Sequence, residues 1–126
     1  MIEHAYPSAL QGWLVLVLKR HVQALHELSA EEFAELGDLL PRTVQMLRAH
    51  LSCEKEYVAC FAEAEHFKHV HVHIVPKPHD LPSELRGVAI FRMLKDNEVD
   101  PAITEKIKTL CEELRILFTD KRGQRS

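Results

Sequence analysis

The sequence lacks the features that mark several specialised classes of protein. Its three cysteines, Cys53, Cys60 and Cys111, form no Cys-x-x-Cys pair, so we expect no disulfide framework and a reducing compartment. The formal net charge is −3, with 16 basic and 19 acidic residues, and there is no basic excess to favour a nucleic-acid partner. The longest apolar run, residues 13–18, is far too short to span a membrane, and no basic stretch followed by an apolar segment opens the chain. We therefore expect a cytoplasmic protein with no nucleic-acid partner, membrane span or signal peptide.

What remains is the composition of one ordinary globular domain. Of the 126 residues, 46% are hydrophobic and 28% are charged, which suffices for a core and a solvated surface. No internal repeat, low-complexity segment or linker interrupts the sequence. Residues 1–126 are therefore expected to form a single domain.

Two segments of the first half have clear signatures. The apolar run at 13–18 predicts a short strand that is buried on both faces. Ser29 and Glu32 have the spacing of a capping box, and the apolar residues that follow at helical intervals predict a helix to about His50. Pro41 lies inside this pattern and should kink the helix or split it in two.

The second half alternates shorter elements. Residues 57–62 and the histidine-rich stretch 69–75 both have strand patterns, and their closeness in sequence favours an antiparallel hairpin. Three prolines within 76–82 predict an irregular loop, and residues 88–91 are compatible with an edge strand. The Asp-Pro pair at 100–101 is typical of a helix start and predicts a last helix.

The most informative stretch is His69-Val70-His71-Val72-His73-Ile74-Val75-Pro76. Successive side chains of a strand point to opposite faces, so His69, His71 and His73 should share one face. Imidazole has an unperturbed pKa of ~6.5, close to physiological pH. A row of three on a rigid strand with an apolar back therefore points to phosphate or metal chemistry.

Three interpretations of this row are open on the residues alone. In the first interpretation, the three histidines have only a structural role. It can also bind a metal through two neighbouring histidines, with His66, His79 or Cys60 as further ligands, although none of these has a recognisable ligand spacing. In the third interpretation a neutral imidazole attacks phosphorus, with its tautomer fixed and donors placed at the phosphoryl oxygens. The spacing suits this third interpretation best, because a central nucleophile would have a supporting histidine on each side.

The same residues resemble the signature of the histidine triad (HIT) superfamily. The stretch 69–75 matches its pattern of three histidines that alternate with apolar residues and end on two apolar residues. Gly12, the apolar run after it and the Lys-Arg-His-Val block at 19–22 resemble an early block of that family. The likeness covers roughly residues 6–78, well over half of the chain.

The resemblance implies an α+β fold with an antiparallel sheet, a long helix and a C-terminal helix, usually assembled as a homodimer. It implies hydrolysis or transfer at the α-phosphate of a nucleotide conjugate, such as a dinucleoside polyphosphate or a nucleoside phosphoramidate. His71 would be the nucleophile that forms a nucleotidyl-histidine intermediate, His73 would contact the phosphate or the leaving group, and His69 would orient the network. Neither a metal nor another cofactor is implied.

Three departures from the family pattern favour an altered nucleotide pocket. Trp13 stands where a fourth histidine often follows the glycine, and it is interpreted either as a packing residue or as a substrate-binding N–H donor. The segment Ala64-Glu65-His66 replaces a Gly-Gln-Ser or Gly-Gln-Thr, so that Glu65 would repel an anionic substrate while His66 could donate to it or lie at the surface. Only eleven residues precede Gly12, where the family has about two further strands that help to form the nucleoside pocket. We expect an intact catalytic strand beside a reduced or rebuilt pocket.

The sequence therefore predicts a HIT-type hydrolase or nucleotidyl transferase with a small-molecule nucleotide substrate. His69, His71 and His73 are the expected catalytic residues, and His66 and Trp13 the expected substrate-binding residues. The departures at Trp13 and Glu65 motivate an alternative, which is a non-catalytic nucleotide-binding homodimer.

Overall fold

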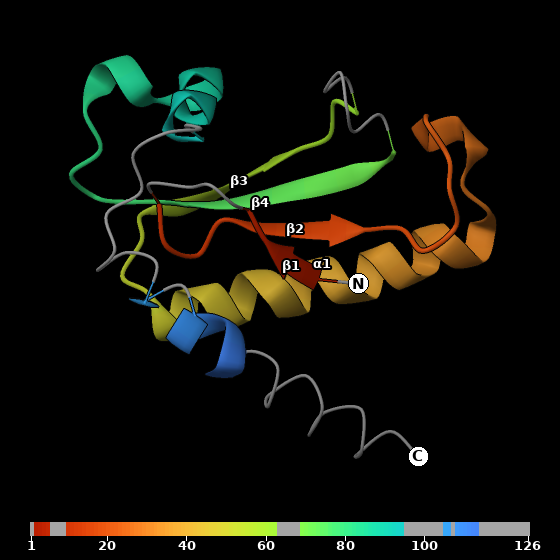
Figure 1. The fold of residues 1–126 in the computed structure, drawn as a ribbon, viewed down its shortest axis with the longest axis horizontal. Coiled ribbons are helices and arrows are strands. Elements are labelled where there is room, and N and C mark those ends of the chain that lie inside the picture. Colours follow the sequence, from red (N-terminus) through yellow and green to blue (C-terminus); the bar gives the residue numbers. More distant parts are fainter. Residues whose placement is uncertain (1, 6–9, 63–68, 95–104, 107, 114–126) are drawn as a thin grey trace.

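The computed structural model describes residues 2–5, 10–62, 69–94, 105–106 and 108–113. Its centre is a four-stranded antiparallel sheet with the strand order β1-β2-β4-β3 (Figure 1). The strands are β1 (Ile2–His4), β2 (Leu14–Val17), β3 (Lys55–Ala59) and β4 (His71–Lys77). The helical elements are η1 (Leu25–Glu27), α1 (Ala30–His50), η2 (Ser83–Leu85) and η3 (Gly87–Met93). The predicted α+β class with an antiparallel sheet and a long helix is confirmed.

Different helical elements pack on the two faces of the sheet. The long helix α1 runs along one face, and η2 and η3 lie over the other (Figure 1). Alternation along β4 sends Val72 and Ile74 into the cluster formed with Met46 and Leu47 of α1. Val75 belongs to the opposite cluster, whose buried members are Leu10, Trp13, Val15, Val75, Leu81 and Ile90. Because His71 and His73 share the parity of Val75, they face η3 and not α1.

Helix α1 begins as the sequence predicts and then continues past its proline. The Ser29 Oγ accepts from the Glu32 amide at 3.1 Å, and Glu32 Oε1 accepts from the Ser29 amide at 2.8 Å, which completes the capping box. Of the two outcomes predicted at Pro41, a kink or a split, the split is wrong, since one helix covers Ala30–His50. Packing of an apolar stripe on both sides of Pro41 outweighs the single backbone hydrogen bond that the proline removes.

The central strands follow the sequence closely. Strand β2 covers Leu14–Val17 with the burial expected for a strand covered on both faces. Strand β3 lies at 55–59, slightly earlier than the predicted 57–62, and pairs antiparallel with β4 as expected. The turn that joins these two strands lies outside the described residues.

Two predictions for the segment after the histidines are corrected. Strand β4 extends through Pro76 to Lys77, so the irregular loop begins later than predicted. Pro76 is compatible with the strand because the β2–β4 register ends at Leu14↔Ile74, which leaves only β3 beside it. Residues 88–91 belong to the 3-10 helix η3 and not to an edge strand.

The ends of the chain contribute less to the described fold. Among residues 2–5 and 10–11, which the structure describes before Gly12, one short strand, β1, pairs with β2. Residues 105–106 and 108–113 are helical, and Leu110 packs into the cluster between the sheet and α1. The predicted start of this last helix at 100–101 lies outside the described residues. Within the described ranges, no helix combines the length and apolar character needed to cross a membrane.

Candidate active site

The second and third histidines of the triad lie in the middle of the sheet. Strand β4 is flanked by β2 and β3, and its residue His73 lies opposite Val15 on one side and Ala59 on the other. His71 lies opposite Val17. The two residues are 7% and 9% exposed, respectively, so their rings are held by surrounding protein. Their ring centroids are 4.7 Å apart at an interplanar angle of 71°.

A backbone carbonyl fixes the tautomer of His71. Its Nδ1 lies 2.7 Å from the carbonyl oxygen of His69, which can only accept a hydrogen bond. In the neutral ring Nδ1 therefore carries the proton, and the lone pair is on Nε2. This is the tautomer that a histidine needs in order to attack an electrophile through Nε2.

An indole fixes the tautomer of His73 in the opposite sense. Trp13 Nε1–H donates to His73 Nδ1 at 3.0 Å, which leaves the proton of a neutral His73 on Nε2. Burial, and then the neighbouring His71, lower the pKa of His73 to about 4. At neutral pH His73 is therefore an uncharged ring that can donate a hydrogen bond from Nε2.

Trp13 lies behind His73. Its side chain is completely buried, and its ring meets that of His73 edge-on at 5.9 Å. With no exposed surface, Trp13 fits the interpretation as a packing residue. Its indole N–H donates its hydrogen bond to His73. The sequence places this residue beside the triad but gives no sign of the hydrogen bond.

His69 precedes strand β4, so the triad does not lie entirely on one strand as expected. Its Nε2–H donates to the carbonyl of Leu18, and its Nδ1 accepts from the Val22 amide at 3.2 Å. Both ring nitrogens are thus bonded to the backbone of the segment that follows β2. A further backbone bond from the Val70 amide to the Val22 carbonyl, at 2.8 Å, closes the same connection. His69 thereby holds in place the carbonyl that orients His71.

The Lys-Arg-His-Val block at 19–22 supports this connection. The ring of His21 stacks on that of His69 with centroids 5.0 Å apart and planes 4° apart. Arg20 points the other way, donates to the Glu27 carbonyl at 2.6 Å and forms an ion pair with Glu32 at 2.7 Å. The Arg20 hydrogen bond and the Ser29 amide lower the pKa of Glu32 to about 2.

Phe91 is a member of the site that sequence reasoning missed. Its ring centroid lies 4.9 Å from that of His73 and 5.0 Å from that of Trp13, edge-on in both cases. Phe61 contacts Phe91 in turn at 5.6 Å. Residues 88–91 were expected to form an edge strand, and this interpretation gave no reason to place Phe91 beside the triad.

The remaining predicted site residue cannot be placed. His66 and its neighbour Glu65 lie outside the described residues. The expected contact of His66 with substrate therefore stays a prediction. In the described ranges, no group of three or more His, Cys, Asp or Glu side chains has the arrangement of a metal site.

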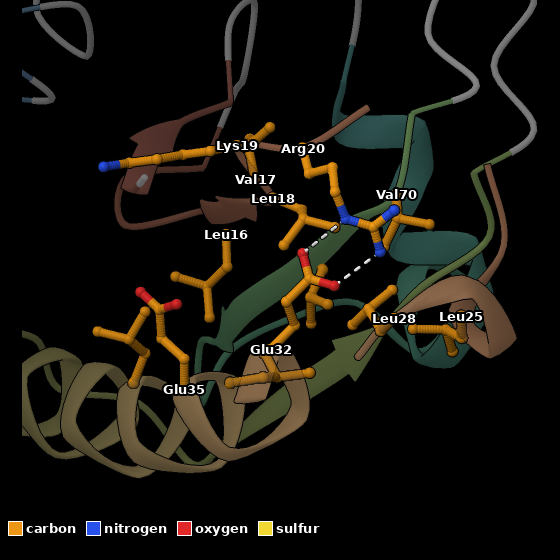
Figure 2. Close-up of a pocket in the computed structure, with 13 residues that line it drawn as sticks. Leu16, Val17, Leu18, Lys19, Arg20, Leu25, Leu28, Glu32, Glu35 and Val70 are labelled. Carbon is orange, nitrogen blue, oxygen red and sulfur yellow. Dashed lines mark hydrogen bonds and ion pairs between the residues drawn. The ribbon is translucent and has the colours of Figure 1, made fainter. Parts of the chain in front are cut away.

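A separate pocket of about 210 Å³ lies between the sheet and the first half of α1 (Figure 2). Its walls are mostly aliphatic, and the ion pair between Arg20 and Glu32 lies among the residues that line it (Figure 2). The lining residues are Leu16, Val17, Leu18, Lys19, Arg20, Leu25, Leu28, Glu32, Glu35, Leu36, Leu39, Val70 and Val72. No triad histidine is among them, so this pocket is distinct from the candidate active site.

Comparison with solved structures identifies proteins that have a similar fold. No family model and no curated protein matches the sequence. Among solved structures, the chain is similar to a histidine triad protein from Bradyrhizobium japonicum, with 21% identity, a TM-score of 0.61, and coverage of 79% of this chain and 73% of that one. It is also similar to a Hit-like protein involved in cell-cycle regulation from Bartonella henselae, with 15% identity, a TM-score of 0.55, and coverage of 82% and 74%.

These likenesses define the class of fold. Two independent solved structures share the arrangement of sheet and helices over most of their length. The chain therefore has the fold of the histidine triad proteins. The resemblance suggested by the stretch 69–75 is confirmed at the level of the fold.

Proposed function

We propose that this protein is a HIT-type hydrolase or nucleotidyl transferase that acts at the α-phosphate of a nucleotide conjugate. The observation that carries the proposal is the 2.7 Å hydrogen bond from His71 Nδ1–H to the His69 carbonyl. It assigns the lone pair of His71 to Nε2, on a ring held in the centre of a sheet with the histidine triad fold. A dinucleoside polyphosphate or a nucleoside phosphoramidate is the expected class of substrate.

The reaction needs two displacements at phosphorus. In the first, His71 Nε2 forms a bond to phosphorus, and the bond to the leaving group breaks with its electron pair going to the leaving group. In the second, a water oxygen bonds to phosphorus, the P–N bond breaks and its electron pair returns to Nε2, while the water proton passes to solvent. For a transferase, the hydroxyl or amine of an acceptor replaces the water.

His73 and His69 have different tasks in this scheme. Since His73 Nδ1 accepts from Trp13, its Nε2–H is the donor available to a phosphoryl oxygen or to the leaving-group atom. The lowered pKa keeps the ring neutral, so it acts as a hydrogen-bond donor. His69 bonds to the backbone through both nitrogens and acts as a positioning residue through its carbonyl.

Replacing the nucleophile tests the proposal. His71→Ala and His71→Gly should each lower turnover of an adenosine phosphoramidate or a diadenosine polyphosphate by at least about 10³-fold. Intact-mass measurement of the wild type during turnover should show a gain of one nucleotidyl group, which both variants lack. His79→Ala, which changes an exposed histidine beyond β4, is the matched control and should retain activity. Full activity in His71→Ala would refute the mechanism.

The alternative function is nucleotide binding without catalysis. The near-complete burial of His71 and His73 favours it, because a substrate must reach rings that are less than a tenth exposed. Calorimetry with adenosine and guanosine monophosphates, run beside the turnover assay, separates the two functions. Binding by a wild type that shows neither turnover nor a mass adduct would support the alternative.

We further propose that the protein is a cytoplasmic homodimer. Phe33 on α1 and Leu25 on η1 are large apolar side chains that are 46% and 41% exposed, as expected for a surface that a second copy covers. All three cysteines are free thiols, in keeping with a reducing compartment. Sedimentation should give twice the 14.5 kDa chain mass, and a species of 14.5 kDa at high concentration would refute the dimer.

A further inference from the structure

A row of aromatic rings leads from the candidate active site to the molecular surface. His73 contacts Phe91 at 4.9 Å, and Phe91 contacts Phe61 at 5.6 Å, both edge-on. His73 is 9% exposed, Phe91 is half-buried and Phe61 is 54% exposed. The row therefore has one end in the sheet beside the proposed reaction centre and the other end in solvent.

We propose that Phe61, supported by Phe91, is a stacking platform for a planar aromatic ring of the substrate. This inference rests on the proposed function and adds a specificity-determining residue to it. A flat ring covalently linked to the reacting phosphorus would cover the exposed face of Phe61 while the phosphoryl group lies at His71 and His73. The triad would then supply the chemistry, and the two phenylalanines would select substrates that carry a ring.

The register of the sheet explains why Phe61 lies on the triad side. In the β3–β4 pair, Ala59 lies opposite His73, so Ala59 and His73 point to the same face. Phe61 is the next residue of the same parity, and its contact with Phe91 shows that it continues on that face. Ala59 itself is small, and Phe61 is the bulky apolar side chain that follows it on this face.

The backbone beside Phe61 is held in an uncommon conformation. Ala62 has φ +54°, in the left-handed region that residues other than glycine seldom adopt. Its side chain is buried at 9% exposure in the cluster formed with Val22 and Val70. Val22 and Val70 also belong to the connection that holds His69. The platform and the triad are thus attached to the same packed cluster, which fixes one relative to the other.

The chemistry of the platform defines the class of ligand. A phenyl ring offers a flat apolar face and no hydrogen-bonding group, so it accepts any planar ring and discriminates little between bases. The ring can be the base of the transferred nucleotide, or it can belong to the leaving group. Both have the same stacking chemistry, and substrates that carry a ring on only one side distinguish them.

Equilibrium binding tests the platform without depending on turnover. Wild-type protein should bind adenosine monophosphate more tightly than ribose 5-phosphate, which lacks the base, by about tenfold or more. In Phe61→Ala this difference should disappear, in Phe61→Leu it should shrink, and in Phe61→Tyr it should be retained. Val58→Ala is the matched control, because Val58 is 49% exposed on β3, the strand that leads to Phe61, but lies opposite Ile74 on the other face.

Kinetics locate the ring. In adenosine phosphoramidate the only aromatic ring is the adenine of the transferred group. In a ribose 5-phosphoranilidate the only aromatic ring is the aniline of the leaving group. Phe61→Ala should raise KM by about tenfold for the substrate whose ring stacks and leave the KM of the other unchanged. If neither is turned over but monophosphate binding still depends on Phe61, the catalytic proposal fails and the platform stands.

Two outcomes would overturn the platform. Equal loss of affinity for adenosine monophosphate and ribose 5-phosphate in Phe61→Ala would show that the residue does not recognise a ring. A change in sedimentation of Phe61→Ala, with the preference for adenosine monophosphate intact, would assign Phe61 to a contact between copies of the chain.

Discussion

The hydrogen bond from Trp13 to His73 predicts a specific result for the substitution Trp13→Phe. Phenylalanine keeps an aromatic ring against Phe91 but removes the N–H that donates to His73 Nδ1 at 3.0 Å. Leaving that buried acceptor without its donor costs about 1–3 kcal/mol, and the smaller ring adds roughly 1 kcal/mol for the space left behind. We therefore expect the free energy of unfolding to fall by about 2–4 kcal/mol.

The same substitution should change the protonation pattern of one ring. Without the indole N–H, residue 13 no longer holds the proton of His73 on Nε2, so both tautomers of the His73 ring become populated. Nitrogen-15 NMR of the histidine rings reports this directly, and urea unfolding gives the stability. Ile90→Val is the matched control, because Ile90 is 1% exposed in the same cluster and its shortening should cost only about 0.5–1.5 kcal/mol. If Trp13→Phe costs no more than this control and leaves the tautomer of His73 unchanged, the role assigned to Trp13 is wrong.

Three further predictions concern stability. Because the folded-state pKa of His73 is about 4 and the ordinary value 6.5, the unfolded chain binds more protons between these values, so stability should fall as pH drops from 6.5 through 4. Between pH 7 and 4.5 the free energy of unfolding, measured with urea, should fall by about 2 kcal/mol because of His73. In His73→Gln the fall over the same pH range should be smaller by that amount. An equal fall in both proteins would contradict the assignment. The lowered pKa of Glu32, about 2, acts in a different window, because the stability it contributes is lost only as pH falls from 4.5 through 2. Ser29→Ala removes the acceptor of the Glu32 amide and should lower the free energy of unfolding by about 1 kcal/mol. Ser52→Ala, an exposed change just beyond the helix, should leave it unchanged, and equal unfolding midpoints for the two serine variants would argue against the cap.

Much of the fold could be predicted because its signals are local. The capping box at Ser29 and Glu32 needs only four consecutive residues, and the apolar run that forms β2 needs only its own length. The order of β2, α1, β3 and β4 along the chain followed from these signals and from the spacing of the histidines. Predictions failed where packing between distant segments opposed a local rule, as at Pro41 in α1 and at residues 88–91 in η3.

The candidate site was predictable in part. The alternation of 69–75 identified His71 and His73, which share a face of β4. The alternation gave no indication that His69 precedes the strand or that its ring binds the backbone at Leu18 and Val22, about fifty residues earlier in the sequence. Phe61 and Phe91 carry no motif, and only their ring contacts associate them with His73.

The sequence by itself pointed to the residues that we propose carry the chemistry, since the alternation of side chains along a strand and the residue types are both read from consecutive positions. Tertiary structure decided the tautomer of His73. That property depends on a partner brought close by folding, an indole 60 residues away in the chain, whereas the His69 carbonyl that fixes the tautomer of His71 is only two residues away. A hydrogen bond requires two atoms within about 3 Å, and only the paired register of β2 and β4 brings Trp13 that close to His73.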